Sequence, residues 1–278
     1  MKVIKSIGLV LLVLLLLVSV VSASNHTVAF WRLIKEKPSP YLYMYEDFSD
    51  LTWRKVVGID GLVSYYSQSN IRVIPQEGSF STDNGYLTVY DDEGFDKIIQ
   101  IKIPYENVNS KENLDLDKLS YIVVTYELWT DTVIPERVIM RPYVRDSNDH
   151  KAYVGSDWCS LYNKGLYMPN SSTYSTFTFA DKITLATSSS SRDRICCVVA
   201  VDPEDVSKTT VSYYVNGIGN ELTYEEWITS EAEYLHHYEV AFKSPYSSSI
   251  SIDNFSLYAF DRSFKGDIKD VLKEVNYK

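Results

Sequence analysis

Residues 250–260 read ISIDNFSLYAF, a run in which apolar and polar side chains largely alternate. Successive side chains of a strand point to opposite faces of a sheet, so this period of about two is typical of a strand with one buried face. The run therefore predicts a half-buried β-strand close to the end of the chain.

Similar runs, rich in the 23 tyrosines and in Val, Ile and Thr, recur along the sequence. They cover residues 41–45, 86–90, 97–103, 121–129, 138–144, 175–179, 195–201, 210–215 and 238–242. Turn-forming stretches separate many of them, including Asn216-Gly217. Many strands without alternating helices predict an all-β fold of two packed antiparallel sheets.

Only the tail departs from this pattern. From Gly266 onward, apolar residues fall at helical spacing with charges between them: Ile268, Val271, Leu272 and Val275. This spacing predicts a short amphipathic helix that packs on the sheets.

The N-terminus has the order of a signal peptide. Residues 1–5 carry two lysines, residues 7–21 are almost wholly apolar, and small residues end the run at Ala23. We expect cleavage after Ala23 and a secreted or cell-surface protein, with an uncleaved membrane anchor as the alternative. The expected parts are a signal peptide (1–23), an N-terminal extension (24–40), the β-domain (41–262) and the C-terminal helix (263–278).

The chain is acidic, with a formal net charge of -10. Removal of Lys2 and Lys5 with the signal peptide makes the charge -12, and the sequence has no cluster of lysine or arginine. Nucleic acid and anionic membrane surfaces are therefore not expected as partners, and a membrane contact is expected only through an uncleaved anchor.

Three cysteines are too few for a disulfide framework. A single bridge from Cys159 to Cys196 or Cys197 is one interpretation, and buried thiols are the other. The sequence also has three Asn-x-Ser/Thr sites, of which Asn170 is expected on the surface and Asn254 inside a strand.

Three segments resemble the jelly-roll domains of the concanavalin A-like and laminin-G-like group. They read YEDFSD at 45–50, followed by Trp53, then TVSYYVNG at 210–217 and IDNFSLYAFDR at 252–262. The resemblance implies a jelly-roll β-sandwich. It also implies a structural calcium ion between Glu46 or Asp47 and Asp253, since hard oxygen ligands suit that ion.

No catalytic constellation is recognisable. The E-x-D-x-x-E spacing of related glucanases is absent, so paired carboxylates are not expected on one strand. Residues 162–167, YNKGLY, are similar to the Tyr/Lys/Tyr strand of alginate-lyase-like jelly rolls, but one residue is missing and the Arg and Gln-His elements have no evident counterpart. We therefore assign no catalytic residue.

Glycan binding requires aromatic rings beside polar groups, and the stretch 129–167 is dense in both. We expect one concave sheet to carry the glycan-binding residues Trp129, Arg141, Tyr143, Arg145, Trp158 and Tyr162. The alternative is that most of these rings fill the core.

The resulting hypothesis is a non-catalytic extracellular recognition module whose partner is a carbohydrate or a cell-surface glycan. One alternative is a polysaccharide hydrolase or lyase with an unfamiliar active site. A second alternative is a protein–protein or adhesion module.

Overall fold

The structure is a computed structural model with two compact units, residues 1–40 and 41–278. It describes residues 39–59, 61–75, 78–91, 99–103, 114–130, 137–145, 151–153, 160–162, 165–169, 176–178, 186–222, 233–243 and 248–277. The predicted signal peptide and nearly all of the N-terminal extension lie outside these ranges. Among the described residues, the helix is too short and too polar to cross a bilayer.

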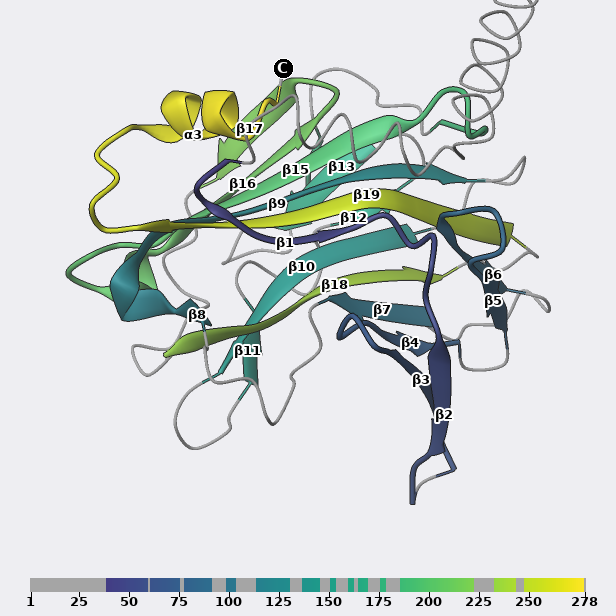
Figure 1. Ribbon diagram of the computed structural model, residues 1–278. Coiled ribbons are helices and arrows are strands. Elements are labelled where there is room, and N and C mark those ends of the chain that lie inside the picture. The colour runs from purple at the N-terminus through teal and green to yellow at the C-terminus, as the bar shows by residue number, and fades with distance from the viewer. Residues whose placement is uncertain are drawn as a thin grey trace, which may run out of the picture. The chain divides into compact units, whose positions relative to one another are not determined.

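The second unit is a sandwich of two antiparallel sheets, which run above and below each other in Figure 1. In spatial order, the eight-stranded first sheet contains β17 (Ile218–Leu222), β16 (Thr210–Val215), β15 (Asp193–Ala200), β9 (Leu119–Thr130), β19 (Ser248–Asp261), β6 (Leu87–Asp91) and β5 (Ser79–Ser81), with β1 (Leu42–Glu46) also paired to β19.

The second sheet has eleven strands. Its main order is β14 (Thr176–Thr178), β13 (Gly165–Pro169), β12 (Ser160–Tyr162), β10 (Arg137–Arg145), β18 (Tyr234–Lys243), β7 (Ile99–Ile103), β4 (Arg72–Ile74), β3 (Val63–Ser67) and β2 (Trp53–Val57). In addition, β11 (Lys151–Tyr153) pairs with β10 and β8 (Leu114–Asp115) with β18. The predicted all-β jelly-roll sandwich is confirmed, and its two antiparallel sheets fit a concanavalin A-like fold.

Each of the ten predicted runs forms a strand. The strands that the sequence did not predict are β2 to β5, β8, β11 to β13 and β17, and none of these is longer than five residues. Such short strands give a weak periodic signal, and pairing with neighbouring strands decides their conformation.

The strand β19 pairs with β9 along most of its length and with β6 and β1 on its other side. A bulge between Asp253 and Ser256 interrupts its register, and Asn254 takes a φ of 50° there. The extra residue lets both Ile252 and Phe255, three positions apart, face the core. The bulge explains why the alternation in the sequence slips at this point.

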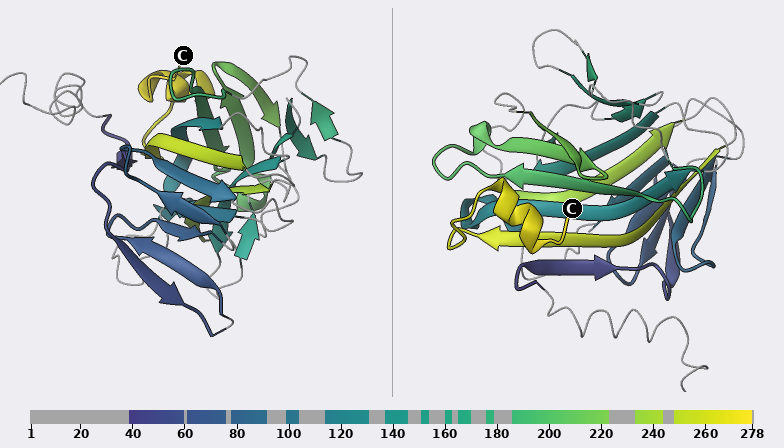
Figure 2. Two further views of the ribbon diagram at one scale, coloured as in Figure 1. Left: turned by 90° about the vertical axis from the view of Figure 1, so that its right-hand side faces the viewer. Right: turned by 90° about the horizontal axis from the view of Figure 1, so that it is seen from above.

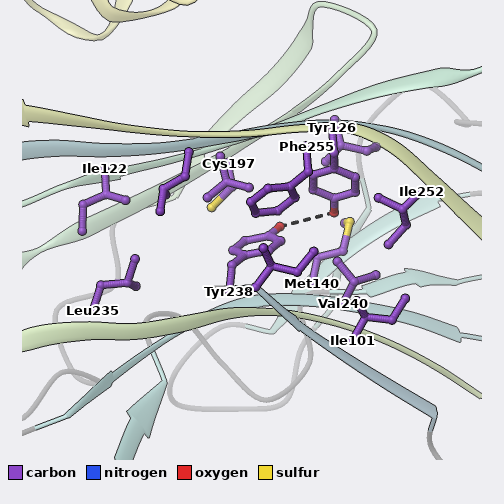
Figure 3. Close-up of a cluster of buried hydrophobic side chains, with 14 of the residues drawn as sticks. Ile101, Ile122, Tyr126, Met140, Cys197, Leu235, Tyr238, Val240, Ile252 and Phe255 are labelled. Atoms are coloured by element: carbon purple, nitrogen blue, oxygen red, sulfur yellow. Dashed lines mark hydrogen bonds between the residues drawn. The ribbon is translucent and has the colours of Figure 1, made fainter. Parts of the chain in front are cut away.

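The core lies between the sheets and contains tyrosines as well as aliphatic side chains (Figure 3). The hydroxyls of Tyr126 on β9 and Tyr238 on β18 are 3.3 Å apart, so they join the two sheets. Tyr213 on β16 likewise donates to the carbonyl oxygen of Met140 on β10, at 2.9 Å. Buried hydroxyls need such partners, and burial raises the pKa of Tyr238 well above its usual value.

The turn between β16 and β17 is formed by Asn216 and Gly217, whose φ angles are 51° and 81°. Two successive positive φ angles are what a two-residue hairpin turn requires, and Asn and Gly adopt them at low cost. The predicted tight turn is confirmed.

The predicted C-terminal helix is also confirmed, as α3 (Ile268–Glu274). Asp267 caps it by accepting from the backbone N–H groups of Lys269 and Asp270, and Asp270 completes the capping box. Two 3₁₀ turns, η1 (Leu116–Lys118) and η2 (Val206–Lys208), complete the secondary structure of the described residues. Val271 and Val275 pack with Val123, Cys196 and Phe260, so α3 covers part of the outer face of the first sheet.

Cys196 and Cys197 are both free thiols, fully buried on opposite faces of β15. Cys197 lies in the core between the sheets, whereas Cys196 lies beneath α3. Because both thiols are free, the interpretation of a disulfide to one of them is wrong, and the buried-thiol alternative is confirmed. Burial raises the pKa of Cys197 to about 12. Cys159 lies outside the described residues.

We expect the substitution Phe255→Ala to lower the free energy of unfolding by about 3–5 kcal/mol, because it leaves a cavity between the sheets. Phe255 is 0% exposed, and its ring centroid lies 6.1 Å from that of Tyr126 and 6.3 Å from that of Tyr238. Urea unfolding followed by circular dichroism measures the change. The control Val57→Ala, at a residue 60% exposed, should shift stability by less than about 0.5 kcal/mol. Equal effects of the two variants would contradict the assigned core.

Candidate functional site

The outer face of the second sheet carries charged and aromatic side chains. On β10, Val138 and Met140 belong to the core, so Arg141 points to the opposite face. On β18, Tyr238 and Val240 belong to the core in the same way, and Glu239 points outward. Because alternate positions share a face, the outward residues of neighbouring strands form rows across the sheet.

One such row joins six neighbouring strands through successive Cα partners. From β2 to β10 its members are Arg54, Tyr66, Arg72, Lys102, Glu239 and Arg141, which we call the cationic row. Strands lie about 4.8 Å apart, so five steps span about 24 Å. Four cations against one carboxylate give the row a formal charge of 4 - 1 = +3, on a chain whose formal charge is -10.

Glu239 anchors the buried end of the cationic row and is 0% exposed. Its Oε1 accepts from Arg141 Nε at 3.0 Å and Nη2 at 2.8 Å, and from the Tyr143 hydroxyl at 3.4 Å. Its Oε2 lies 3.5 Å from the Lys102 ammonium and accepts no hydrogen bond from any residue that the structure describes. The carboxylate is thus fixed by two cations while one oxygen keeps acceptor capacity.

Aromatic rings accompany the cations at both ends of the row. At the buried end, the ring of Tyr143 stacks on that of His237, with centroids 4.4 Å apart, and Arg141 lies 5.0 Å from the Tyr143 centroid. At the other end, Arg54 and Arg72 lie 5.9 Å and 5.4 Å from the centroid of Tyr66. Such cation–π contacts hold the cations in place and keep flat rings beside them.

A bulge in β18 brings two imidazoles to the same place. The register shifts opposite Tyr143 and Val144, so Tyr143 pairs with His237 and Val144 with Leu235. His236 is the extra residue, and its Nδ1 contacts the Nδ1 of His237. Both imidazoles are buried, and His237 stacks on Tyr143 beside Glu239.

Of the predicted glycan-binding residues, Arg141 and Tyr143 come together beside Glu239. Arg145 ends β10 and pairs through its backbone with Lys151 and Tyr234, and Tyr162 pairs with Arg137. The side chains of Arg145 and Tyr162, and the whole of Trp158, lie outside the described residues.

Trp129 does not share this face, and the prediction of one common surface is wrong for it. It lies on β9, in the first sheet, and is 4% exposed. Arg192 covers its ring at 4.5 Å from the centroid, and Tyr86 packs at 4.8 Å with its ring edge-on. A ring closed in this way has no face left for a sugar.

The residues predicted to bind calcium have other partners. Glu46 accepts from the backbone N–H of Phe48 at 2.9 Å, and Asp47 accepts from that of Ser49 at 3.1 Å. These bonds hold the turn in which Phe48, with a φ of 59°, enters the core. Asp253 instead pairs with Arg192. Within the described ranges no three His, Cys, Asp or Glu side chains gather around a common point, and calcium binding stays a prediction.

Arg192 supplies positive charge to an acidic part of the outer face of the first sheet. Its Nη1 bonds Glu127 Oε2 at 2.7 Å and also contacts Asp253 Oδ2. Burial raises the pKa of Asp253, against the opposing effects of the Asn254 N–H and of Arg192.

Asn254 and Tyr45 complete this network. The Asn254 amide donates to Glu127 Oε2 at 3.0 Å and accepts from the Tyr45 hydroxyl at 2.8 Å, so both ends of the side chain at this Asn-x-Ser site are engaged. Burial, followed by the nearby carboxylates, raises the pKa of Tyr45 to about 12.

Sequence reasoning missed Lys102, Glu239, His237 and the outer residues of the cationic row. They come from strands between residues 54 and 239, so no local motif contains them. The available signal was weak: Lys102 and Glu239 are charged residues in otherwise apolar strand runs. The expectation that the chain has no cationic cluster holds along the sequence but is wrong in space, because strand pairing assembles one.

The sequence matches no protein-family model and no curated protein. Among solved structures, the chain is similar to the alginate lyase from Corynebacterium sp., with 12% identity and a TM-score of 0.46 over 80% of this chain and 97% of that one. The alginate lyase from a Chlorella virus gives 11% identity and a TM-score of 0.43 over 68% and 91%. The carbohydrate recognition domain of Emp47p gives 12% identity and a TM-score of 0.43 over 76% and 98%. These are loose superpositions, and the fold assignment rests on the two sheets.

We expect Arg192→Ala to destabilise the protein by about 1–2 kcal/mol near neutral pH, because it leaves Glu127 and Asp253 without their cation. Loss of the guanidinium raises the pKa of Asp253 further. A carboxyl with a raised folded pKa is costly only while it is ionised, so the loss should shrink as pH falls through that pKa.

Urea midpoints of wild type and variant at neutral and mildly acidic pH measure this difference. Arg194→Ala is the control, because Arg194 bonds the Asn276 carbonyl oxygen and not a carboxylate. Its effect should not depend on pH. A loss in Arg192→Ala that stays constant or grows in acid would contradict the assigned network.

Proposed function

We propose that this protein is a carbohydrate-binding module whose ligand is a saccharide chain with anionic groups, bound along the cationic row. The observation that carries the proposal is the register of the row, which aligns Arg54, Arg72, Lys102 and Arg141 on one face. The predicted signal peptide would export such a module to the polysaccharides outside the cell.

The charge of the row supports an anionic ligand. The row holds four cations and one carboxylate, a formal charge of 4 - 1 = +3, on a chain with a net charge of -10. The adjacent cations of the row lower the stability of the sheet locally, because like charges on neighbouring strands repel each other. Carboxylate or sulfate groups of a ligand would relieve this repulsion and form charge-assisted hydrogen bonds with the guanidinium groups.

An aromatic member of the row favours a saccharide as the ligand. Tyr66, which is partly exposed, lies beside Arg54 and Arg72, and aromatic rings pack against the C–H faces of sugars. This ring fits a ligand that carries sugar rings together with some negative charges.

The single carboxylate favours binding over hydrolysis. Glycoside hydrolases use two carboxyl groups that flank the scissile bond. In the described part of the cationic row Glu239 is the one acidic residue, and two cations hold it.

We expect the variant Arg141→Gln to weaken binding of acidic oligosaccharides by about tenfold or more, since it removes a charged hydrogen-bonding partner. The matched control is Arg194→Gln. Arg194 also lies 5.0 Å from a tyrosine ring, that of Tyr277, but on the first sheet. Calorimetry with residues 24–278 and with uronic acid, sulfated and neutral oligosaccharides measures the affinities.

Several outcomes would overturn the proposal. Equal binding of neutral and acidic saccharides would show that the cations play no part. Equal losses in Arg141→Gln and Arg194→Gln would place the ligand elsewhere, and duplex DNA binding as tightly as the saccharide would indicate unselective charge attraction. Circular dichroism of each variant checks that the fold is intact.

A lyase is the second candidate, favoured by the contact of Tyr143 and His237. A phenol and an imidazole 4.4 Å apart between their ring centroids are groups that can transfer protons, and Arg141 lies beside them. The strand β12, which contains Tyr162, pairs directly with β10.

If the protein is a lyase, incubation with acidic polysaccharides should generate unsaturated products with ultraviolet absorbance. Tyr143→Phe should then abolish turnover while it preserves binding, because only the hydroxyl is removed. Binding without unsaturated products would leave the binding module as the function.

A further inference from the structure

The hairpin formed by β2 and β3 projects away from the sandwich, as the views in Figures 1 and 2 agree. The strand β2 is the last strand of the second sheet, so one of its edges has no neighbouring strand among those described. The turn is closed by a hydrogen bond from Gly58 N to Leu62 O at 2.9 Å, with Gly61 at a φ of 79°.

The tip of the hairpin is apolar and exposed. Ile59 is fully exposed, Val57 is 60% exposed and Val56 is 36% exposed. Single exposed aliphatic residues are common on protein surfaces. Here, however, three of the five exposed large hydrophobic residues of the described chain occur within four positions. Such a concentration at a projecting tip indicates a contact surface.

We propose that this tip, Val56, Val57 and Ile59, inserts into a lipid surface that carries anionic headgroups. Arg54 and Lys55 lie directly behind the aliphatic residues, and both are exposed. Counted from the sequence, residues 53–67 contain Arg54, Lys55 and Asp60 and have a formal charge of 2 - 1 = +1. Aliphatic residues at the tip and cations at the level of the headgroups are the arrangement of an interfacial membrane contact.

A second copy of the chain fits the hairpin less well. In an antiparallel pair that overlaps β2 with β2 completely, Lys55 would lie opposite Lys55, with Arg54 nearby. Like charges directly opposite destabilise strand pairs, and charged residues on an edge strand are a common barrier to such association. An anionic lipid surface instead complements the same two cations.

The net charge of -10 does not by itself prevent this contact, because repulsion between exposed charges is screened over short distances. At the base of the hairpin, Trp53 packs against Phe80, with ring centroids 4.8 Å apart. Four residues at about 3.3 Å each place Val57 about 13 Å farther along the strand. The Debye length is about 8 Å at physiological salt, so repulsion from the sandwich is largely screened at the tip.

Sedimentation with vesicles tests the proposal. The protein for this test is residues 41–278, which form one compact unit with both core clusters and lack the apolar run at 7–21. We expect binding to mixed phosphatidylglycerol–phosphatidylcholine vesicles and much weaker binding to phosphatidylcholine alone. The double variant Val57→Ser, Ile59→Ser should lower the partition coefficient by about tenfold, because it removes most of the apolar tip.

Two further variants distinguish the contributions. Lys55→Gln should weaken binding and flatten its dependence on salt. Tyr43→Ser, at a residue 43% exposed on β1, is the matched control for loss of an exposed apolar side chain and should bind like wild type. These variants leave Arg141 and Lys102 intact, so saccharide binding is tested separately.

Unchanged vesicle binding in the double variant would overturn the proposal, as would equal binding to both kinds of vesicle. Self-association of wild type that disappears in the double variant, without vesicle binding, would identify a second copy as the partner and would also overturn it.

Discussion

Tyr126 and Tyr238 reach from opposite sheets and meet at their hydroxyl groups inside an otherwise apolar core. The contact depends on each strand placing alternate side chains in one layer, where the two hydroxyls satisfy each other. Once that layer is filled, the remaining side chains of each strand must lie on the outer faces. The chemistry of this molecule is therefore restricted to two surfaces, and the registers of the strands decide which residues share each surface.

The two outer faces differ in how their polar and aromatic side chains are covered and paired. On the first sheet, α3 covers one region, and Arg192 covers the ring of Trp129 while it pairs with Glu127 and Asp253. In these contacts, the polar and aromatic side chains on the first sheet are paired with other groups of the protein. On the second sheet, the same residue types lie in the cationic row, which holds four cations and one carboxylate.

The cationic row on this acidic protein shows that net charge does not predict which partners bind through short-range contacts. Screening limits each exposed charge to about 8 Å at physiological salt, so a ligand responds to the groups that it touches. Arg72 and Lys102 are thirty positions apart in the sequence, yet they are direct Cα partners on neighbouring strands. The same locality applies to the β2–β3 hairpin, where the exposed Arg54 and Lys55 directly precede the exposed Val56 and Val57.

The sequence by itself determined the long strands, the Asn216-Gly217 turn and α3, because alternation, positive-φ residues and helical spacing are local properties. It also identified Arg141 and Tyr143, which stand two apart on one strand and so share a face. Only the tertiary structure decided that Trp129 lies on the other sheet, that Arg192 pairs with Asp253, and that Glu239 joins Arg141 to Lys102. The reason is physical, because sheet order and register are set by pairing between strands that are distant in the sequence. The residues of one strand do not specify which strand pairs beside it.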